Sequence, residues 1–131
     1  DLGGKYGILL PGANAEVEDA GNEKGQKRMG QPPWSDPKRY LDNSPYYRAD
    51  RIRTPLLIIH GREDGASPAR EAEMMFSGLR RLGRTAQLAV YEGEGHVITD
   101  WEPERAVDAA DRVLSFLRRY TSQGAQASTE R

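Results

Sequence analysis

Two side chains that could share acid–base chemistry, Asp64 and His96, each follow an apolar stretch typical of a β-strand. Asp64 comes shortly after the aliphatic run 56–59, and His96 lies in a glycine-rich loop that begins after Tyr91. In a parallel sheet both loops leave from the same edge. A carboxylate that accepts the imidazole N–H fixes its tautomer and stabilises its cation, as a histidine general base requires. The sequence therefore predicts an Asp64–His96 pair at one sheet edge.

The order of the two residues supports this interpretation. One crossover unit of helix plus strand separates them, and an Asp that precedes a His, both after strands, fits the α/β-hydrolases. In those enzymes the nucleophile comes earlier still. A second interpretation stays open, in which Asp64 caps its own turn and His96 is an exposed side chain in another turn.

The elements expected to hold this pair follow the order of an α/β fold with parallel strands and flanking helices. Short apolar runs at 6–10, 56–59 and 86–91 are typical of buried strands. A helix is expected to begin with Ser67 as N-cap and Pro68 at its first position, and to end at Gly83.

Each of the two expected helices has one apolar face. In the first helix this face consists of Ala72, Met75, Phe76, Leu79 and Leu82. The second helix should begin at Pro103, and its face consists of Ala106, Val107, Ala110, Val113, Leu114 and Leu117. From residue 122 the chain is small and polar, so we expect a disordered tail at 122–131 after one domain at 1–121.

Between the first two strands the sequence is irregular. Residues 14–31 mix charges with glycines and indicate a loop. Asp36 can cap a short helix that has Pro37 in its first turn. A further helical turn after Ser44-Pro45 would carry Tyr46 and Tyr47. Local packing of these aromatic residues beside the sheet is the simpler interpretation, and an aromatic shelf for a substrate is the alternative.

Composition limits the remaining function classes. The 131 residues suffice for one modest domain, and the hydrophobic content of 37% is low for a fully buried α/β sheet, which suggests a partly open surface or a missing partner segment. A net charge of −1 gives no reason to expect nucleic acid or a membrane as a partner. No stretch has the length and apolarity of a membrane span or a signal peptide, and we expect a cytoplasmic protein.

Several motifs together resemble one enzyme family. Ser44-Pro45 is followed by Ala49-Asp50-Arg51-Ile52, by Thr54-Pro55, by His60-Gly61-x-x-Asp64 and by Gly93-Glu94-Gly95-His96. This series, within a match from about residue 29 to 120, resembles the C-terminal part of the catalytic domain of prolyl oligopeptidase family serine peptidases. Acylaminoacyl-peptidase-like members are the most similar. The lead-in from Ser44 to Pro55 is what narrows the resemblance from α/β-hydrolases in general to peptidases.

The resemblance implies a role for each matching residue. Asp64 would be the acid and His96 the base of a Ser-Asp-His triad, whereas His60 would be structural. A peptide would be the substrate of the full-length protein, and no metal or cofactor is implied. Two positions depart from the family pattern, which has Val where Ser67 stands and Gly where Val97 stands. The β-branched Val97 could restrict how the His96 loop turns.

The nucleophile has no counterpart in the sequence. The family presents its serine in a Gly-x-Ser-x-Gly elbow, and no such motif occurs in these 131 residues. We expect this serine upstream of Asp1, so the chain alone should be inactive, either as a fragment of a peptidase or as a truncated relative. The alternatives are an esterase-type hydrolase fragment and a non-catalytic interaction module. Whichever of these the chain is, an uncovered sheet edge would favour its self-association.

Overall fold

The computed structural model describes residues 21–25 and 27–129. The strand expected at 6–10 and part of the loop expected at 14–31 lie outside the described residues. Helix α3 (Pro37–Asp42) and the 3-10 segment η1 (Pro45–Arg51) precede strand β1 (Leu56–Gly61). Helix α4 (Ala69–Arg81), strand β2 (Ala86–Tyr91), the short turn η2 (Ile98–Asp100) and helix α5 (Pro103–Thr129) follow.

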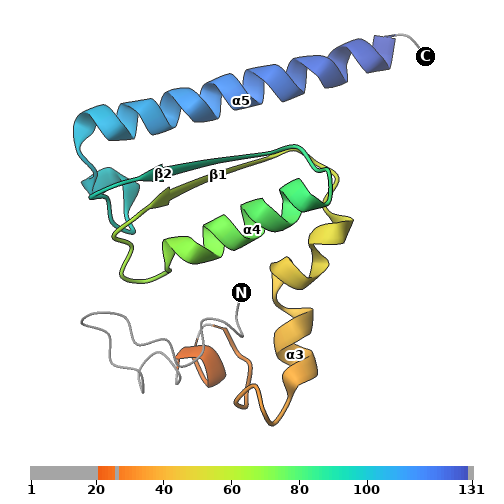
Figure 1. Cartoon of the computed structure of the whole chain (residues 1–131), viewed down its shortest axis with the longest axis vertical. Helices are drawn as coiled ribbons and strands as arrows, with labels where there is room; N and C mark the ends of the chain where they lie inside the picture. The colour runs from red at the N-terminus through yellow and green to blue at the C-terminus, as the bar shows by residue number, and fades with distance from the viewer. Residues whose placement is uncertain (1–20, 26, 130–131) are drawn as a thin grey trace.

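Strands β1 and β2 are parallel, as the sequence predicts. Their register pairs Leu56 with Ala86 at one end and Gly61 with Tyr91 at the other. Helix α4 connects them on one side of the sheet, and α5 lies on the opposite side (Figure 1). Because parallel strands end together, the loops after Gly61 and Tyr91 leave the sheet side by side. This α/β arrangement places the Asp64 and His96 loops at one edge.

Helix α4 packs on the sheet through part of its expected apolar face. Leu79 is fully buried and forms a core with Ala49 and Ala86, and the partly buried Met75 and Phe76 pack against it. The N-cap of α4 is Pro68 and not Ser67, because the backbone of Pro68 is still extended (φ −61°, ψ 134°) and its carbonyl oxygen accepts a hydrogen bond from the N–H of Glu71 at 2.9 Å. This shift by one residue corrects the expected helix start.

The segment before β1 is a packed elbow. Asp36 caps α3 as predicted, since its Oδ1 accepts a hydrogen bond from the backbone N–H of Arg39 at 3.1 Å. The ring of Tyr46 packs so closely on Gly78 of α4 that a Cβ at position 78 would lie 3.2 Å from it. This contact favours local packing for Tyr46, whereas Tyr47 is 56% exposed.

Helix α5 exposes the face that the sequence pattern marks as apolar. Val107, Leu114 and Leu117 are 49–61% exposed, whereas Ala109 on another side of the helix is fully buried. The described sheet has only two strands, and no other described element covers that face of α5. The helix also continues to Thr129, into the segment that we expected to be a tail. Among the described residues, no helix combines the length and the apolarity needed to cross a membrane.

Candidate active site

Asp64 sits in the turn between β1 and α4, with its side chain almost fully buried. Its Oδ1 accepts hydrogen bonds from the backbone N–H groups of Ala66 at 2.8 Å and Ser67 at 2.7 Å. An Asp side chain that binds the backbone two and three residues further on folds the chain into a tight turn. The turn therefore holds the carboxylate in one place, as the capping interpretation expects.

The second carboxylate oxygen of Asp64 faces the loop after β2. Oδ2 lies 2.8 Å from Nδ1 of His96. The two predicted residues thus meet, and the capping role and the pairing with His96 are both present. The side chain of His96 is 58% exposed, whereas that of Asp64 is 5% exposed. A buried acid that holds an accessible imidazole leaves Nε2 of His96 open to a reactant, and no described residue binds that atom.

The surroundings of Asp64 favour its ionised form. Burial acts to raise the pKa of the Asp64 carboxyl, but the hydrogen bonds from His96 and from the backbone of Ser67 and Ala66 outweigh it, and the pKa is lowered. An ionised carboxylate can only accept, so Nδ1 of His96 carries the hydrogen in this bond. This is the tautomer in which Nε2 can take up a proton.

Gly61 lets the two loops approach each other. A Cβ at this position would lie 2.3 Å from the carbonyl oxygen of Glu94 and 2.4 Å from that of Gly95. The backbone N–H of Glu63 also donates to the Glu94 carbonyl at 2.8 Å. Because side chains cannot fit in that space, only glycine allows the loop of Asp64 to lie directly against the loop of His96.

A buried carboxylate fixes the His96 loop to α5, which the sequence analysis did not predict. Glu94 is 4% exposed, and its Oε1 lies 3.0 Å from Nη1 of Arg105. The same oxygen accepts from the backbone N–H of Glu102 at 3.3 Å, and Arg105 also donates to the carbonyl of Glu92. Glu94 stands two positions before His96 in a glycine-rich loop, but nothing in the sequence links it to Arg105.

Trp101 supports the same loop from the other side. It is 7% exposed, and its Nε1–H donates to the carbonyl oxygen of Gly95 at 2.9 Å. Its ring lies 5.0 Å from that of Tyr91 at the end of β2. A buried indole needs such a partner, and here the partner is the residue next to His96. Sequence reasoning also missed this contact, because nothing in the local pattern links Trp101 to Gly95.

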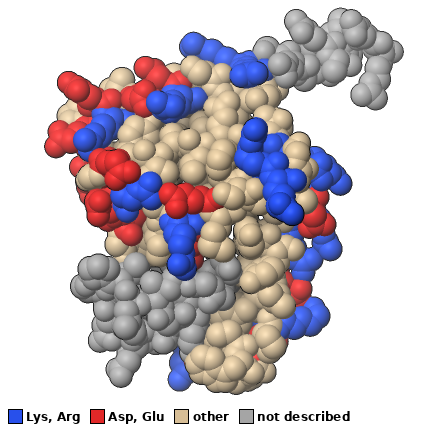
Figure 2. Space-filling view, viewed as in Figure 1, with Lys and Arg blue, Asp and Glu red and all other residues tan. Residues whose placement is uncertain are grey.

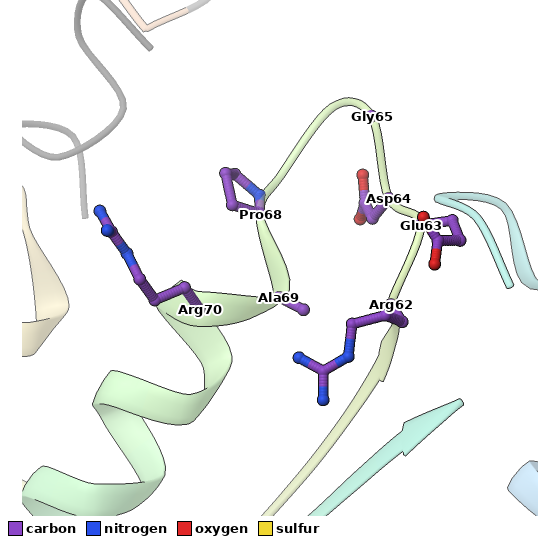
Figure 3. Close-up of a pocket in the computed structure, with 7 residues that line it drawn as sticks. All are labelled: Arg62, Glu63, Asp64, Gly65, Pro68, Ala69 and Arg70. Atoms are coloured by element: carbon purple, nitrogen blue, oxygen red, sulfur yellow. The ribbon is translucent and has the colours of Figure 1, made fainter. Parts of the chain in front are cut away.

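Two hollows flank Asp64. One, of about 310 Å³, lies on the imidazole side and is lined by Ile59, His60, Gly61, Asp64, Ser67, His96, Ile98 and Trp101. The other, of about 410 Å³, is lined by residues of the β1–α4 loop and by Arg62 and Arg70, which Figure 3 shows at the strand end and at the start of the helix. Arg62 is paired with Glu73 at 2.6 Å and Glu92 at 3.1 Å. Only the first hollow brings together both members of the predicted pair.

The chain is similar in sequence to known peptidases. The profile of the prolyl oligopeptidase family matches residues 18–124. An uncharacterized peptidase of Bacillus subtilis (strain 168), YuxL, is 33% identical over 85 residues, which is 64% of this chain and 13% of that protein. Dipeptidyl-peptidase 5 of Porphyromonas endodontalis is 32% identical over 83 residues, which is 60% of this chain and 12% of that protein.

Solved structures share the fold. The acylaminoacyl peptidase of Pyrococcus horikoshii superposes with a TM-score of 0.62 at 24% identity, over 66% of this chain and 14% of that one. A puromycin hydrolase superposes with a TM-score of 0.51 at 28% identity, over 64% of this chain and 12% of that one. The chain therefore spans between about an eighth and a seventh of the length of these proteins.

Proposed function

Because this chain belongs to the prolyl oligopeptidase family, we propose that Asp64 and His96 are the acid and the base of a serine peptidase triad. The family match covers most of the chain and identifies it as part of a serine peptidase domain. The observation that supports the assignment is the 2.8 Å hydrogen bond between His96 Nδ1 and Asp64 Oδ2, which leaves an exposed imidazole on a buried carboxylate. The serine would come from a segment upstream of Asp1, because no Gly-x-Ser-x-Gly motif occurs in the sequence.

Each group has one role in this proposal. Nε2 of His96 takes the proton of the serine hydroxyl as the hydroxyl oxygen attacks a peptide carbonyl. The imidazolium that forms is stabilised by the ionised Asp64, and it then gives its proton to the leaving amine. A peptide is therefore the proposed substrate. We propose neither nucleic acid nor a membrane as a partner, since the net charge is −1 and Figure 2 shows charges of both signs interspersed on the face in view. The cytoplasmic location stays a prediction.

A fluorophosphonate probe, which labels activated serines, tests this proposal. We expect no labelling of the 131-residue chain, and labelling of a version extended upstream to include a Gly-x-Ser-x-Gly segment. His96→Gln should abolish labelling and peptide cleavage by the extended protein, whereas Asp111→Ala on the exposed side of α5 should leave both unchanged. Labelling of the 131-residue chain would refute the upstream nucleophile. Undiminished cleavage by the His96→Gln variant would refute the role of the base.

Two alternatives are separated by related measurements. An esterase would use the same residues, so matched ester and amide substrates with one acyl group decide between the two activities. A non-catalytic interaction module is favoured by the exposed apolar residues of α5, which include Val107 at 61% exposure. In that case the upstream sequence would lack the serine elbow. Reading that sequence therefore distinguishes a peptidase fragment from a truncated, inactive relative.

A further inference from the structure

Within the described ranges, the peptide unit that joins Gly95 to His96 makes one hydrogen bond. Its carbonyl oxygen accepts from the indole N–H of Trp101 at 2.9 Å. Trp101 is 7% exposed and, like His96, lines the hollow of about 310 Å³. This peptide unit is therefore held by a buried side chain that the proposed mechanism does not use.

The peptide unit before it is held by other groups. The carbonyl oxygen of Glu94 accepts from the backbone N–H of Glu63 at 2.8 Å, and the Glu94 side chain is paired with Arg105. Beyond this point the two backbone torsion angles of Gly95 decide where the next peptide unit lies. Glycine restricts these angles less than other residues do, and a Cβ at position 95 would meet nothing within 4 Å. The chain can therefore turn at Gly95 unless the next peptide unit is held.

The bond from Trp101 removes this freedom. Because a peptide unit is planar, a donor that holds the carbonyl oxygen of Gly95 also orients the backbone nitrogen and Cα of His96. The indole is itself packed in place, since it is buried and its ring lies 5.0 Å from that of Tyr91 in β2. His96 thus has two anchors, with its backbone held through Trp101 and its ring held by Asp64.

We infer that Trp101 is a positioning residue, whose indole N–H fixes the Gly95–His96 peptide so that Nδ1 of His96 reaches Oδ2 of Asp64. The ring bond to Asp64 alone is a weak anchor, because the His96 side chain is 58% exposed. The meaning of this role for catalysis rests on the proposed function, but the contact itself does not. The inference requires the N–H of Trp101, so a ring of the same shape without this N–H should leave the loop free to turn.

The tautomers of the two histidines provide the readout. His96 donates from Nδ1 to Asp64, whereas Nε2 of His60 donates to the carbonyl oxygen of Ser67 at 2.8 Å, because that oxygen can only accept. The two rings therefore carry their hydrogens on different nitrogens. Long-range proton–nitrogen NMR of the ¹⁵N-labelled chain distinguishes them at a pH of about 9, above the ordinary histidine pKa of about 6.5. His96→Gln assigns the signals, since it leaves one histidine in the chain.

The chain has two tryptophans, so one substitution makes the indole of Trp101 unique. Trp34 is 74% exposed, and Trp34→Phe serves as the parent protein. In one derivative of this parent, tryptophan is replaced during expression by benzothienylalanine, which keeps the shape of the indole but has sulfur in place of the N–H. The other derivative carries Trp101→Phe, which removes the N–H and part of the ring. The backbone amide spectrum and the tautomer of His60 show whether each protein is folded.

We expect His96 to carry its hydrogen on Nδ1 in the wild type and in the parent. In both derivatives the ratio of the Nδ1–H to the Nε2–H tautomer of His96 should fall by at least about fivefold, which corresponds to one hydrogen bond of about 1 kcal/mol. His60 should keep its Nε2–H throughout. A folded benzothienylalanine protein with the ratio of the parent would overturn the inference, since packing of the ring would then suffice. If one derivative does not fold, the other decides by the same criterion.

This readout is independent of turnover. A lack of peptidase activity in the protein extended upstream would refute the proposed function but would leave the tautomer of His96 measurable. Conversely, an active peptidase whose His96 tautomer is the same with and without the N–H of Trp101 would refute only the role of Trp101. An Nε2–H tautomer of His96 in the wild type would contradict the Asp64 contact on which both proposals depend.

Discussion

His96 Nδ1 lies 2.8 Å from Asp64 Oδ2, although a helix and a strand separate the two residues in the chain. The contact follows from the sheet register, which pairs Gly61 with Tyr91 at the ends of two parallel strands. Each side chain lies only a few residues beyond its strand end. The arrangement of the backbone alone therefore brings the two side chains close together.

Replacement of Asp64 tests whether its negative charge supports catalysis by His96. Asp64→Asn keeps an acceptor for the turn but loses the charge that stabilises the His96 cation. In the protein extended upstream to include the serine, kcat should fall by about 10⁴-fold, as expected when a triad acid is made neutral. Steady-state peptide hydrolysis measures this, and Asp111→Ala serves as control. A loss smaller than tenfold with an unchanged fold would contradict the assigned role of Asp64.

The pH dependence of stability gives a second test. The pKa of Asp64 is lowered in the folded protein because its hydrogen bonds outweigh its burial. A carboxyl whose folded pKa is depressed contributes stability above its unfolded pKa of about 3.9, and this contribution is lost as the pH falls through the folded pKa. Below a pH of about 4, the stability difference between wild type and Asp64→Asn should therefore shrink as the pH falls further. Urea unfolding of both proteins across the acid range measures this difference in the free energy of unfolding. A difference that grows as the pH falls would contradict the prediction.

Much of this arrangement could be predicted from the sequence. The aliphatic run 56–59 and the stretch 86–91 marked both strands, and the order of strand, helix and strand made them parallel. Asp64 and His96 followed as the chemically competent residues just beyond the strand ends. These predictions depend on local pattern and on connection rules, which a single sequence contains.

The contacts that tune the site could not be predicted in this way. Glu94 pairs with Arg105 and Trp101 binds the Gly95 carbonyl because of how the loop after β2 folds back on α5. That path depends on backbone angles that the residue types do not fix. The sequence also did not predict which side of α5 is buried. The helix has apolar residues on two sides, and only the packing shows that Ala109, and not Val107, is covered.

Gly61 should tolerate no side chain. Gly61→Ala would place a Cβ 2.3 Å from the Glu94 carbonyl oxygen, so the two loops must move apart. We expect a loss of about 1–3 kcal/mol in the free energy of unfolding, as in other overpacked sites. Gly65→Ala in the same loop is the matched control, since its Cβ would meet nothing within 4 Å. Chemical denaturation compares the two variants, and equal stability would show that the close approach is not maintained in solution.

The ion pair of Glu94 should stabilise the His96 loop. Glu94→Ala removes the carboxylate that pairs with the partly exposed Arg105, which keeps its bond to the Glu92 carbonyl, and it frees the backbone N–H of Glu102. We expect Glu94→Ala and Arg105→Ala each to destabilise the chain by about 1–3 kcal/mol, and the double variant to lose less than the sum. A double-mutant cycle by urea unfolding measures the coupling. Strictly additive losses would mean that the two side chains act separately.

The exposed face of α5 should make the isolated chain self-associate. Leu114 and Leu117 are each 49% exposed on this face, and apolar surface that no described element covers favours a second copy of the chain. The double variant Leu114→Glu with Leu117→Lys should weaken association by at least about tenfold, because transferring charged groups into an apolar contact costs more than 1.4 kcal/mol. Sedimentation over a concentration series measures this, with the exposed polar positions in Asp111→Lys and Ser115→Glu as the matched charge control. Association that the α5 variant leaves unchanged would place the contact elsewhere, with the open edge of the two-stranded sheet as the next surface to test.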